Sequence, residues 1–161
     1  MYDLDRYLAI KKLKARQDEI ILNNASELEK YLSAGTIREI VALSLAKDVL
    51  QSGGYLLIDD IESHLNREVV AMLTRFFLDT TLNRKGGVLL FTTHYPEILD
   101  VLPRNDSVYI VQNLNGATVE NLSVILKQHD IRKREAYQSG FLGDTAPDYD
   151  AYLRLKQLFS E

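Results

Sequence analysis

A continuous apolar run that ends in two acidic residues, Tyr55–Asp60, most constrains how this chain folds. The run reads YLLIDD, follows two glycines and lacks polar alternation, which is typical of a strand buried on both faces of a parallel sheet. Asp59 and Asp60 then fall at the carboxyl end of the strand, the edge where open α/β sheets bind ligands. Adjacent carboxylates there suit a hard divalent cation and a water, and they would equally serve to cap the next turn.

The composition and charge restrict the class of protein. The chain has 161 residues, of which 46% are hydrophobic, and we predict a single domain over residues 1–161. Its formal net charge of -4 argues against a surface that coats nucleic acid. Cysteine is absent, which excludes disulfides and thiolate chemistry. Because the sequence shows no signal peptide and no apolar stretch of membrane-spanning length, we expect a cytoplasmic protein with no membrane partner.

The first 31 residues are expected to form a helical lead-in. Apolar residues recur at roughly helical spacing over residues 2–22, which predicts an amphipathic helix. Ser26 and Glu29 have the spacing of a capping box, which predicts a second short helix through Tyr31.

Small residues come directly before a long apolar helix pattern in the segment LSAGTIRE, residues 32–39. At a helix start, Ser33, Gly35 and Thr36 would present free backbone N–H groups and hydroxyls to an anion. An ordinary N-cap at Ser33 explains the same residues. Two glycines after Ser52 are predicted to end this helix before the central strand.

The α/β alternation continues after the central strand. Asn66 is expected to cap a helix whose apolar positions extend to Leu82. Beyond a polar loop, residues 88–93 predict a second buried strand, whose carboxyl end lies beside that of the first. This strand ends at His94, and Pro96 suits the first turn of a short helix that follows. His94 therefore stands at a strand-to-helix corner, where a histidine is also common as a plain turn residue.

Residues 103–161 predict a hairpin and a C-terminal helical tail. The run SVYIVQN, which follows Asp106, predicts a strand, and Asn115 and Gly116 turn it back through Ala117 to Leu122. A final helix with an apolar side is expected to begin near Thr145 and Pro147. A local basic cluster lies between them and would either contact a phosphate backbone or form a solvated face; its members are Lys127, Arg132, Lys133 and Arg134.

Four motifs, in this order, resemble the second half of an ABC-type ATPase head. They are LSAGT at residues 32–36, YLLIDD at 55–60, SHLN at 63–66 and FTTH at 91–94. The chain looks like the bacterial AAA-type ATPases of the overcoming-lysogenisation-defect and abortive-infection group, relatives of the SMC and DNA-repair heads. The resemblance covers residues 32–102, with a looser match in the tail. It implies an α/β fold: a partial P-loop NTPase lobe with a mostly parallel sheet flanked by helices, then a β-hairpin and a helix.

The resemblance implies roles for the first two motifs. Ser33, Gly35 and Thr36 stand where the signature motif contacts the γ-phosphate of a nucleotide held by the opposite subunit. Asp59 matches the Walker B aspartate that holds Mg²⁺ through water. Asp60 occupies the position of the usual glutamate that polarises the attacking water, and its shorter side chain leaves slow hydrolysis or a purely nucleotide-sensing role open.

The resemblance also implies roles for the last two motifs. Ser63, Leu65 and Asn66 match the D-loop, with Asn66 where an aspartate is common. His94 matches the switch histidine that senses the γ-phosphate as a hydrogen-bond partner.

The chain contains no GxxxxGK[ST] motif, so the phosphate-binding loop and its lysine are missing. ATP and Mg²⁺, the implied ligands, would then need a P-loop-containing N-terminal half or partner subunit, and the chain alone should be inactive. In the family's sheet order, the P-loop strand lies between the strand at residues 88–93 and the strand at residues 107–112. Because the P-loop strand is missing here, its place in the sheet would be empty. We therefore expect either direct closure of these two strands or self-association. The alternative is a non-catalytic interaction or nucleic-acid-binding module that retains the fold.

Overall fold

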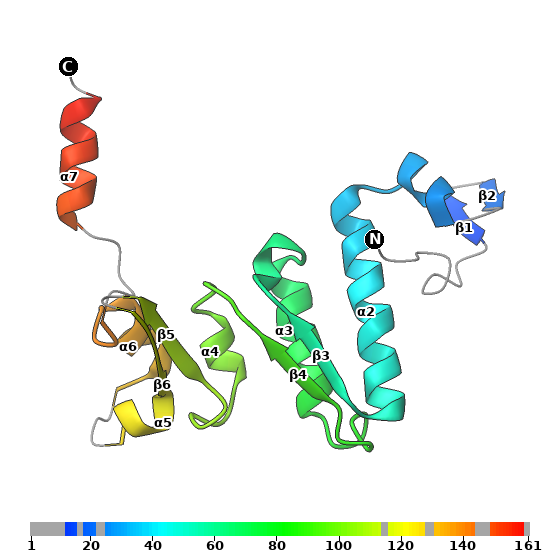
Figure 1. The fold of residues 1–161 in the computed structure, drawn as a ribbon. Helices are drawn as coiled ribbons and strands as arrows, with labels where there is room; N and C mark the ends of the chain where they lie inside the picture. The colour runs from blue at the N-terminus through cyan, green and yellow to red at the C-terminus, as the bar shows by residue number, and fades with distance from the viewer. Residues whose placement is uncertain are drawn as a thin grey trace. The chain divides into compact units, whose positions relative to one another are not determined.

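The structure is a computed structural model that describes residues 12–15, 18–21, 25–113, 116–127, 131–143 and 149–159. It divides into two compact units, Met1–Tyr95 and Pro96–Glu161 (Figure 1). The described parts are mixed α/β, with one parallel and two antiparallel strand pairs. None of the helices in these ranges is long and apolar enough to cross a membrane.

The first described elements of the Met1–Tyr95 unit form a hairpin rather than the predicted amphipathic helix. β1 (Lys12–Ala15) pairs antiparallel with β2 (Asp18–Ile21), so the helix predicted over residues 2–22 is wrong at these positions. The other residues of that range lie outside the described part of the chain. The Lys-Leu-Lys sequence also fits a period of two, and the register pairs Lys14 with Glu19.

A short helix follows the hairpin, as predicted, but with a different start. It is a 3-10 helix, η1 (Ala25–Lys30). Ser26 lies inside it and not at its N-cap, so the capping box is wrong. A 3-10 helix suits so short a segment because each of its hydrogen bonds spans only three residues.

The longest described helix, α2 (Ala34–Ser52), begins and ends where the sequence predicts. Ser33 is its N-cap, and the Ser33 Oγ accepts from the Thr36 N–H at 3.2 Å. At the other end, Gly53 has a φ of +82°, which favours glycine, and its N–H donates to the Val49 carbonyl at 2.8 Å. The chain then enters β3 (Tyr55–Ile58) almost at once.

β3 pairs in parallel with β4 (Val88–Phe91), which confirms the two predicted strands. α3 (Arg67–Leu78) connects them and is capped by Asn66, as predicted, but it ends at Leu78 and does not reach Leu82. The amphipathic pattern is thus interrupted by Asp79, whose N–H closes the helix on the Arg75 carbonyl at 2.9 Å.

The loop before β4 is closed by two residues. The Asn83 Oδ1 accepts from the Gly87 N–H at 2.6 Å, and the Asn83 Nδ2 donates to the Gly87 carbonyl at 2.8 Å. A Cβ at Gly87 would lie 2.9 Å from the Val49 carbonyl oxygen. Glycine is therefore required for this segment to approach α2 so closely.

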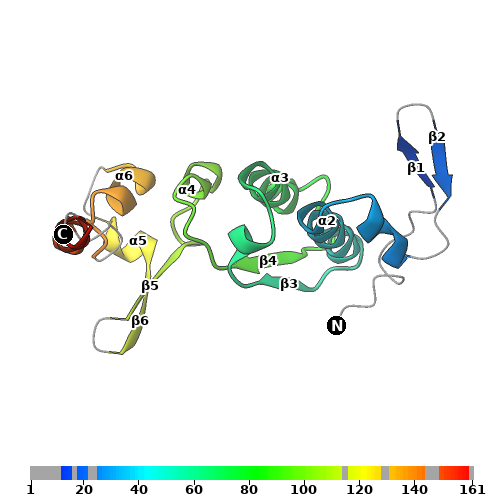
Figure 2. The same cartoon turned by 90° about the horizontal axis from the view of Figure 1, so that it is seen from above.

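The β3–β4 pair has one covered and one open face. α2 and α3 lie on the same side of the strands (Figure 2), and Leu56 is buried. Because successive strand residues point to opposite faces, Tyr55 and Leu57 are instead 73% and 68% exposed. Val88 and Leu90, their partners in the parallel register, are exposed as well. The expectation of strands buried on both faces is therefore wrong, since no described helix of this unit covers the second face.

We call the surface formed by Tyr55, Leu57, Val88 and Leu90 the open sheet face. Its side chains are all apolar or aromatic, and β3 and β4 contain no charged residue. The remaining core of the unit lies under the turn after β3 and along α3, where Ile61, Val70 and Leu73 are fully buried.

The second unit contains the predicted hairpin. β5 (Tyr109–Asn113) pairs antiparallel with β6 (Ala117–Asn121), and Asn115 of the predicted turn lies outside the described residues. Within the described residues of this unit β5 pairs with β6 alone. Residues 88–93 lie in the other unit, so closure of β5 against them stays a prediction.

Three short helices complete this unit. They are α4 (Ile98–Val101), which follows Pro96 as predicted, α5 (Leu122–Ile125) and α6 (Lys133–Gln138). Together with the hairpin they bury one apolar cluster; its members are Leu99, Val108, Ile110, Leu122, Leu126, Ala136 and Leu142.

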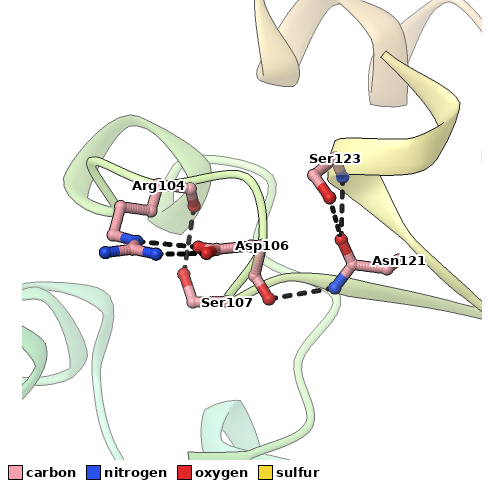
Figure 3. A network of polar contacts seen from close by, with 5 residues as sticks. All are labelled: Arg104, Asp106, Ser107, Asn121 and Ser123. Atoms are coloured by element: carbon pink, nitrogen blue, oxygen red, sulfur yellow. Dashed lines mark hydrogen bonds and ion pairs between the residues drawn. The ribbon is translucent and has the colours of Figure 1, made fainter. Parts of the chain in front are cut away.

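A polar network joins the turn before β5 to the start of α5 (Figure 3). The Arg104 Nε donates to the Asp106 Oδ1 at 2.9 Å, and the Asn121 Nδ2 donates to the Asp106 carbonyl at 2.9 Å. Asn121 then caps α5 by accepting from the Ser123 N–H at 3.0 Å. The hydrogen bond from Arg104 lowers the pKa of Asp106, so the carboxylate form is favoured in the folded chain.

The predicted basic cluster is partly used inside the second unit. Arg134 forms ion pairs with Glu97 at 3.6 Å and Asp100 at 3.1 Å, and the Lys133 Nζ donates to the Leu102 carbonyl. These contacts hold α6 against α4. Of the cluster, only Lys127 and Arg132 remain as exposed side chains without such contacts among the described residues, which weakens the case for a phosphate-binding surface.

The last described helix, α7 (Tyr149–Leu158), confirms the predicted C-terminal helix. Thr145 and Pro147, where its start was predicted, lie outside the described residues. Its apolar residues Leu155 and Leu158 are exposed.

Candidate functional site

The carboxyl ends of β3 and β4 bring three predicted site residues to one edge of the sheet. Asp59 and Asp60 follow β3, and His94 follows β4, in parallel strands that are directly hydrogen-bonded. The pairing continues beyond β4, because the Thr92 N–H donates to the Ile58 carbonyl at 3.2 Å. The turn after β3 and the loop after β4 are therefore fixed to each other.

Thr92 links the two aspartates, and the sequence alone had not singled it out. Its Oγ1 donates to the Asp59 Oδ1 at 2.5 Å and accepts from the Asp60 N–H at 2.7 Å. One hydroxyl thus orients the first carboxylate and holds the backbone of the second. The sequence did contain a signal for Thr92. It is a polar residue directly after one predicted strand, and the paired acids directly follow the neighbouring strand.

Asp60 has a left-handed backbone, with φ +49° and ψ +60°. Aspartate and asparagine tolerate this region better than other residues with a Cβ, because their short polar side chains bond locally. Here the Asp60 Oδ2 accepts from the Ser63 Oγ, and the Ser63 N–H donates to the Asp60 carbonyl at 2.9 Å. Asp60 is the N-cap residue of η2 (Ile61–Ser63), although its carboxylate makes no hydrogen bond to the backbone of that helix.

His94 is exposed and is held through its backbone. Its N–H donates to the Glu62 Oε1 at 2.5 Å, and the next N–H, of Tyr95, donates to the Thr93 Oγ1 at 3.0 Å. Among the described residues no hydrogen bond to the His94 imidazole is present. Glu62, like Thr92, was missed by the sequence reasoning, although it stands two residues after Asp60.

The predicted signature residues lie at the start of α2. Ser33 is occupied as an N-cap, and its Oγ lies 2.9 Å from the Thr36 Oγ1. The ordinary-cap explanation of Ser33 is therefore confirmed. The N–H groups of Ala34 and Gly35, in the first turn of the helix, have no carbonyl acceptor within the helix.

Two side chains of α2 connect this helix start to the predicted D-loop. The Arg38 Nη1 donates to the Ser63 carbonyl at 3.3 Å. The Glu39 Oε1 accepts from the Asn66 Nδ2 at 2.6 Å, while the Asn66 Oδ1 caps α3 by accepting from the Val69 N–H at 3.0 Å. All eight predicted site residues thus belong to the Met1–Tyr95 unit, in which Ser63 is hydrogen-bonded both to Asp60 and, through its carbonyl, to Arg38 of α2.

Comparison with known proteins identifies no relative. No protein-family model, curated protein or solved structure matches the chain. The chemistry of the site is therefore interpreted from its own residues.

We predict that Thr92→Val destabilises the chain by about 1–2 kcal/mol, because it removes two hydrogen bonds, one of them to a carboxylate, at nearly constant volume. Thr92→Ser keeps the hydroxyl and should restore most of the loss. Urea denaturation measures the free energy of unfolding, and the amide ¹⁵N shift of Asp60 reports the lost acceptor. Thr118→Val, at an exposed strand position, is the matched control. An unchanged Asp60 amide in Thr92→Val would contradict the assignment.

Proposed function

We propose that this chain is the C-terminal lobe of an ABC/AAA-type ATPase head, which binds and hydrolyses Mg-ATP once a P-loop-bearing half completes it. One observation carries the proposal: Asp59, Asp60 and His94 follow the carboxyl ends of two parallel strands that pair directly, with the acids held by Thr92. Two acids and an imidazole at one sheet edge are suited to hold a cation, orient a water and donate to a phosphate. The cytoplasm, which supplies Mg-ATP, is the compartment this implies.

The donor set fits Mg²⁺ bound together with a nucleotide. Asp59 and Asp60 each have one carboxylate oxygen engaged by a hydroxyl, of Thr92 and Ser63 respectively, and both residues are exposed. The described residues contain no cluster of three or more metal-ligating side chains. Mg²⁺ commonly takes one or two carboxylates and completes its octahedral shell with water and substrate phosphates. When bound, the ion would neutralise charge on the phosphates.

Asp60 and His94 have complementary roles in this proposal. Asp60 accepts a hydrogen bond from the attacking water and polarises it, with Ser63 orienting the carboxylate. His94, whose imidazole is free of described hydrogen bonds, donates to the γ-phosphate. The left-handed backbone gives a reason why aspartate stands here in place of glutamate, since the local hydrogen bonds of the shorter acid stabilise that conformation.

Gly35 supports a ligand at the start of α2. Its φ is not positive, and a Cβ there would meet only the Ser33 Oγ, at 3.7 Å. Glycine costs a helix about 0.5–1 kcal/mol relative to alanine, so the fold of this chain alone does not explain it. Close approach of a phosphate held by the opposite subunit does explain it, because the first N–H groups of the helix then face the anion.

The open sheet face supports the proposal that a second polypeptide completes the ATPase head. Parallel sheets are normally covered by helices on both faces, whereas Tyr55, Leu57, Val88 and Leu90 are exposed here. The outer edges of β3 and β4 also carry no charge that would discourage strand addition. A polypeptide that supplies a strand and an apolar helix would satisfy both surfaces, and a P-loop followed by its helix is such a unit. In this proposal the signature residues act on nucleotide held by another copy of the head.

Titration calorimetry with Mg-ATP tests the proposal. The isolated chain should bind with a millimolar Kd or weaker, since the loop and lysine that make most phosphate contacts are absent from its sequence. A head completed with a P-loop-bearing half should bind more tightly and hydrolyse ATP. Micromolar binding by a verified monomer would refute the need for the second half, and a completed head without affinity for ATP would refute the function.

A further inference from the structure

We propose that Glu62 is the positioning residue of His94: its carboxylate fixes the His94 backbone and thereby sets where the imidazole points. This inference rests on the proposed function for its role in the reaction. The positioning itself is a property of this chain and can be measured without any nucleotide.

Three features around His94 support the assignment. The Glu62 Oε1 accepts the His94 N–H at 2.5 Å, and Thr93 closes a turn over His94 by accepting the Tyr95 N–H at 3.0 Å. The His94 side chain is exposed and has no hydrogen bond among the described residues. The contact to Glu62 and the turn at Thr93 are therefore the contacts that hold the backbone from which the imidazole projects.

The burial of Glu62 is hard to explain by folding alone. Its Oε2 is buried, and no described donor reaches it. A buried carboxylate oxygen without a hydrogen bond is unfavourable, so its presence in a half-buried residue requires an explanation. A neutral acceptor at the same place would hold the N–H without that cost. We therefore expect Glu62→Gln to keep the contact and to be at least as heat-stable as the original chain.

The position of Glu62 also gives it a link to the acids. Glu62 lies in η2, two residues after Asp60, while Thr92, directly after β4, contacts Asp59 and Asp60. The loop after β4 is thus held to the turn after β3 at two points. In the proposed reaction, this fixes the distance between the water-polarising acid and the phosphate donor, which should affect turnover more than nucleotide binding.

Amide hydrogen exchange on the full chain tests the positioning. In Glu62→Ala the His94 amide should exchange at least tenfold faster, while the Leu73 amide, in the core of α3, reports that the fold persists. Glu62→Gln should restore slow exchange at His94. Glu135→Ala and Glu135→Gln make the same changes at an exposed site in the other unit and should change neither amide. Unchanged exchange at His94 in Glu62→Ala would overturn the proposal.

Turnover of a completed head tests the role in the reaction. Glu62→Ala should lower kcat by about 10²-fold with little change in KM, and Glu62→Gln should recover most of the rate. Faster exchange at His94 with unchanged kcat would overturn the functional role. If the completed head that retains Glu62 does not hydrolyse ATP, the proposed function and the role of Glu62 in the reaction are both refuted. The exchange rate of the His94 amide then still decides whether Glu62 positions His94.

Discussion

In a completed head, Asp60→Asn lowers ATP turnover by about 10²–10⁴-fold and leaves nucleotide binding nearly unchanged. This range is the usual contribution of a positioned general base, and an amide cannot take a proton from the attacking water. The substitution should fold normally, because asparagine tolerates the left-handed backbone that Asp60 adopts at φ +49°. Its side-chain oxygen can still accept from the Ser63 hydroxyl.

Steady-state kinetics and calorimetry on the same preparation separate the two effects. Asp48→Asn is the matched control, since Asp48 is exposed on α2 in the same unit. Turnover that survives Asp60→Asn would show that Asp60 is not the catalytic carboxylate. Asp60→Glu tests the shorter side chain: a faster rate would show that its length limits hydrolysis, even though glutamate suits the left-handed backbone less well.

We expect the pair Leu57→Lys and Leu90→Lys to weaken association of this chain with the proposed P-loop half by at least about 100-fold. Burial of each leucine is worth about 1.5 kcal/mol or more, so losing two costs about 3 kcal/mol before any charge is desolvated. Both side chains point away from the core, at 68% and 58% exposure, so the isolated variant should unfold at nearly the same temperature.

Light scattering of the mixed chains, with a melting curve for each variant alone, measures both quantities. Val111→Lys is the control, because Val111 is equally exposed, at 65%, on a strand of the second unit. Light scattering of the isolated chain also shows whether copies associate through the open sheet face. If they do, the pair of lysine substitutions should lower the measured molecular mass. A double variant that still joins the P-loop half with full affinity would refute the assignment of this surface.

Local signals in the sequence determined most elements of the first unit between Ser33 and His94. Ser33 and Asn66 are caps because a short side-chain oxygen reaches the third N–H of a helix, and Gly53 ends α2 because glycine takes a positive φ without strain. The paired acids after an apolar run, and the histidine after the next one, fell at the same edge because parallel strands share their carboxyl ends.

The same local reasoning failed where two structures fit one pattern. The sequence of residues 12–21 fits both a helical and a strand period. The pairing of β1 with β2 selected the strand, and such pairing is not encoded in the propensity of either segment alone. The run Tyr55–Ile58 looked buried on both faces because it is apolar throughout. Only the placement of α2 and α3 on one side determined which of its residues are covered.

By itself, the sequence determined that Asp59, Asp60 and His94, the side chains proposed for the chemistry, each follow a predicted strand. Only the tertiary structure decided how they are held. Thr92 and Glu62 reach across from one strand end to the other, 32 or 33 residues away along the chain, to fix the acids and the histidine backbone. Such contacts depend on the pairing of β3 with β4, and no pattern within a single segment specifies them.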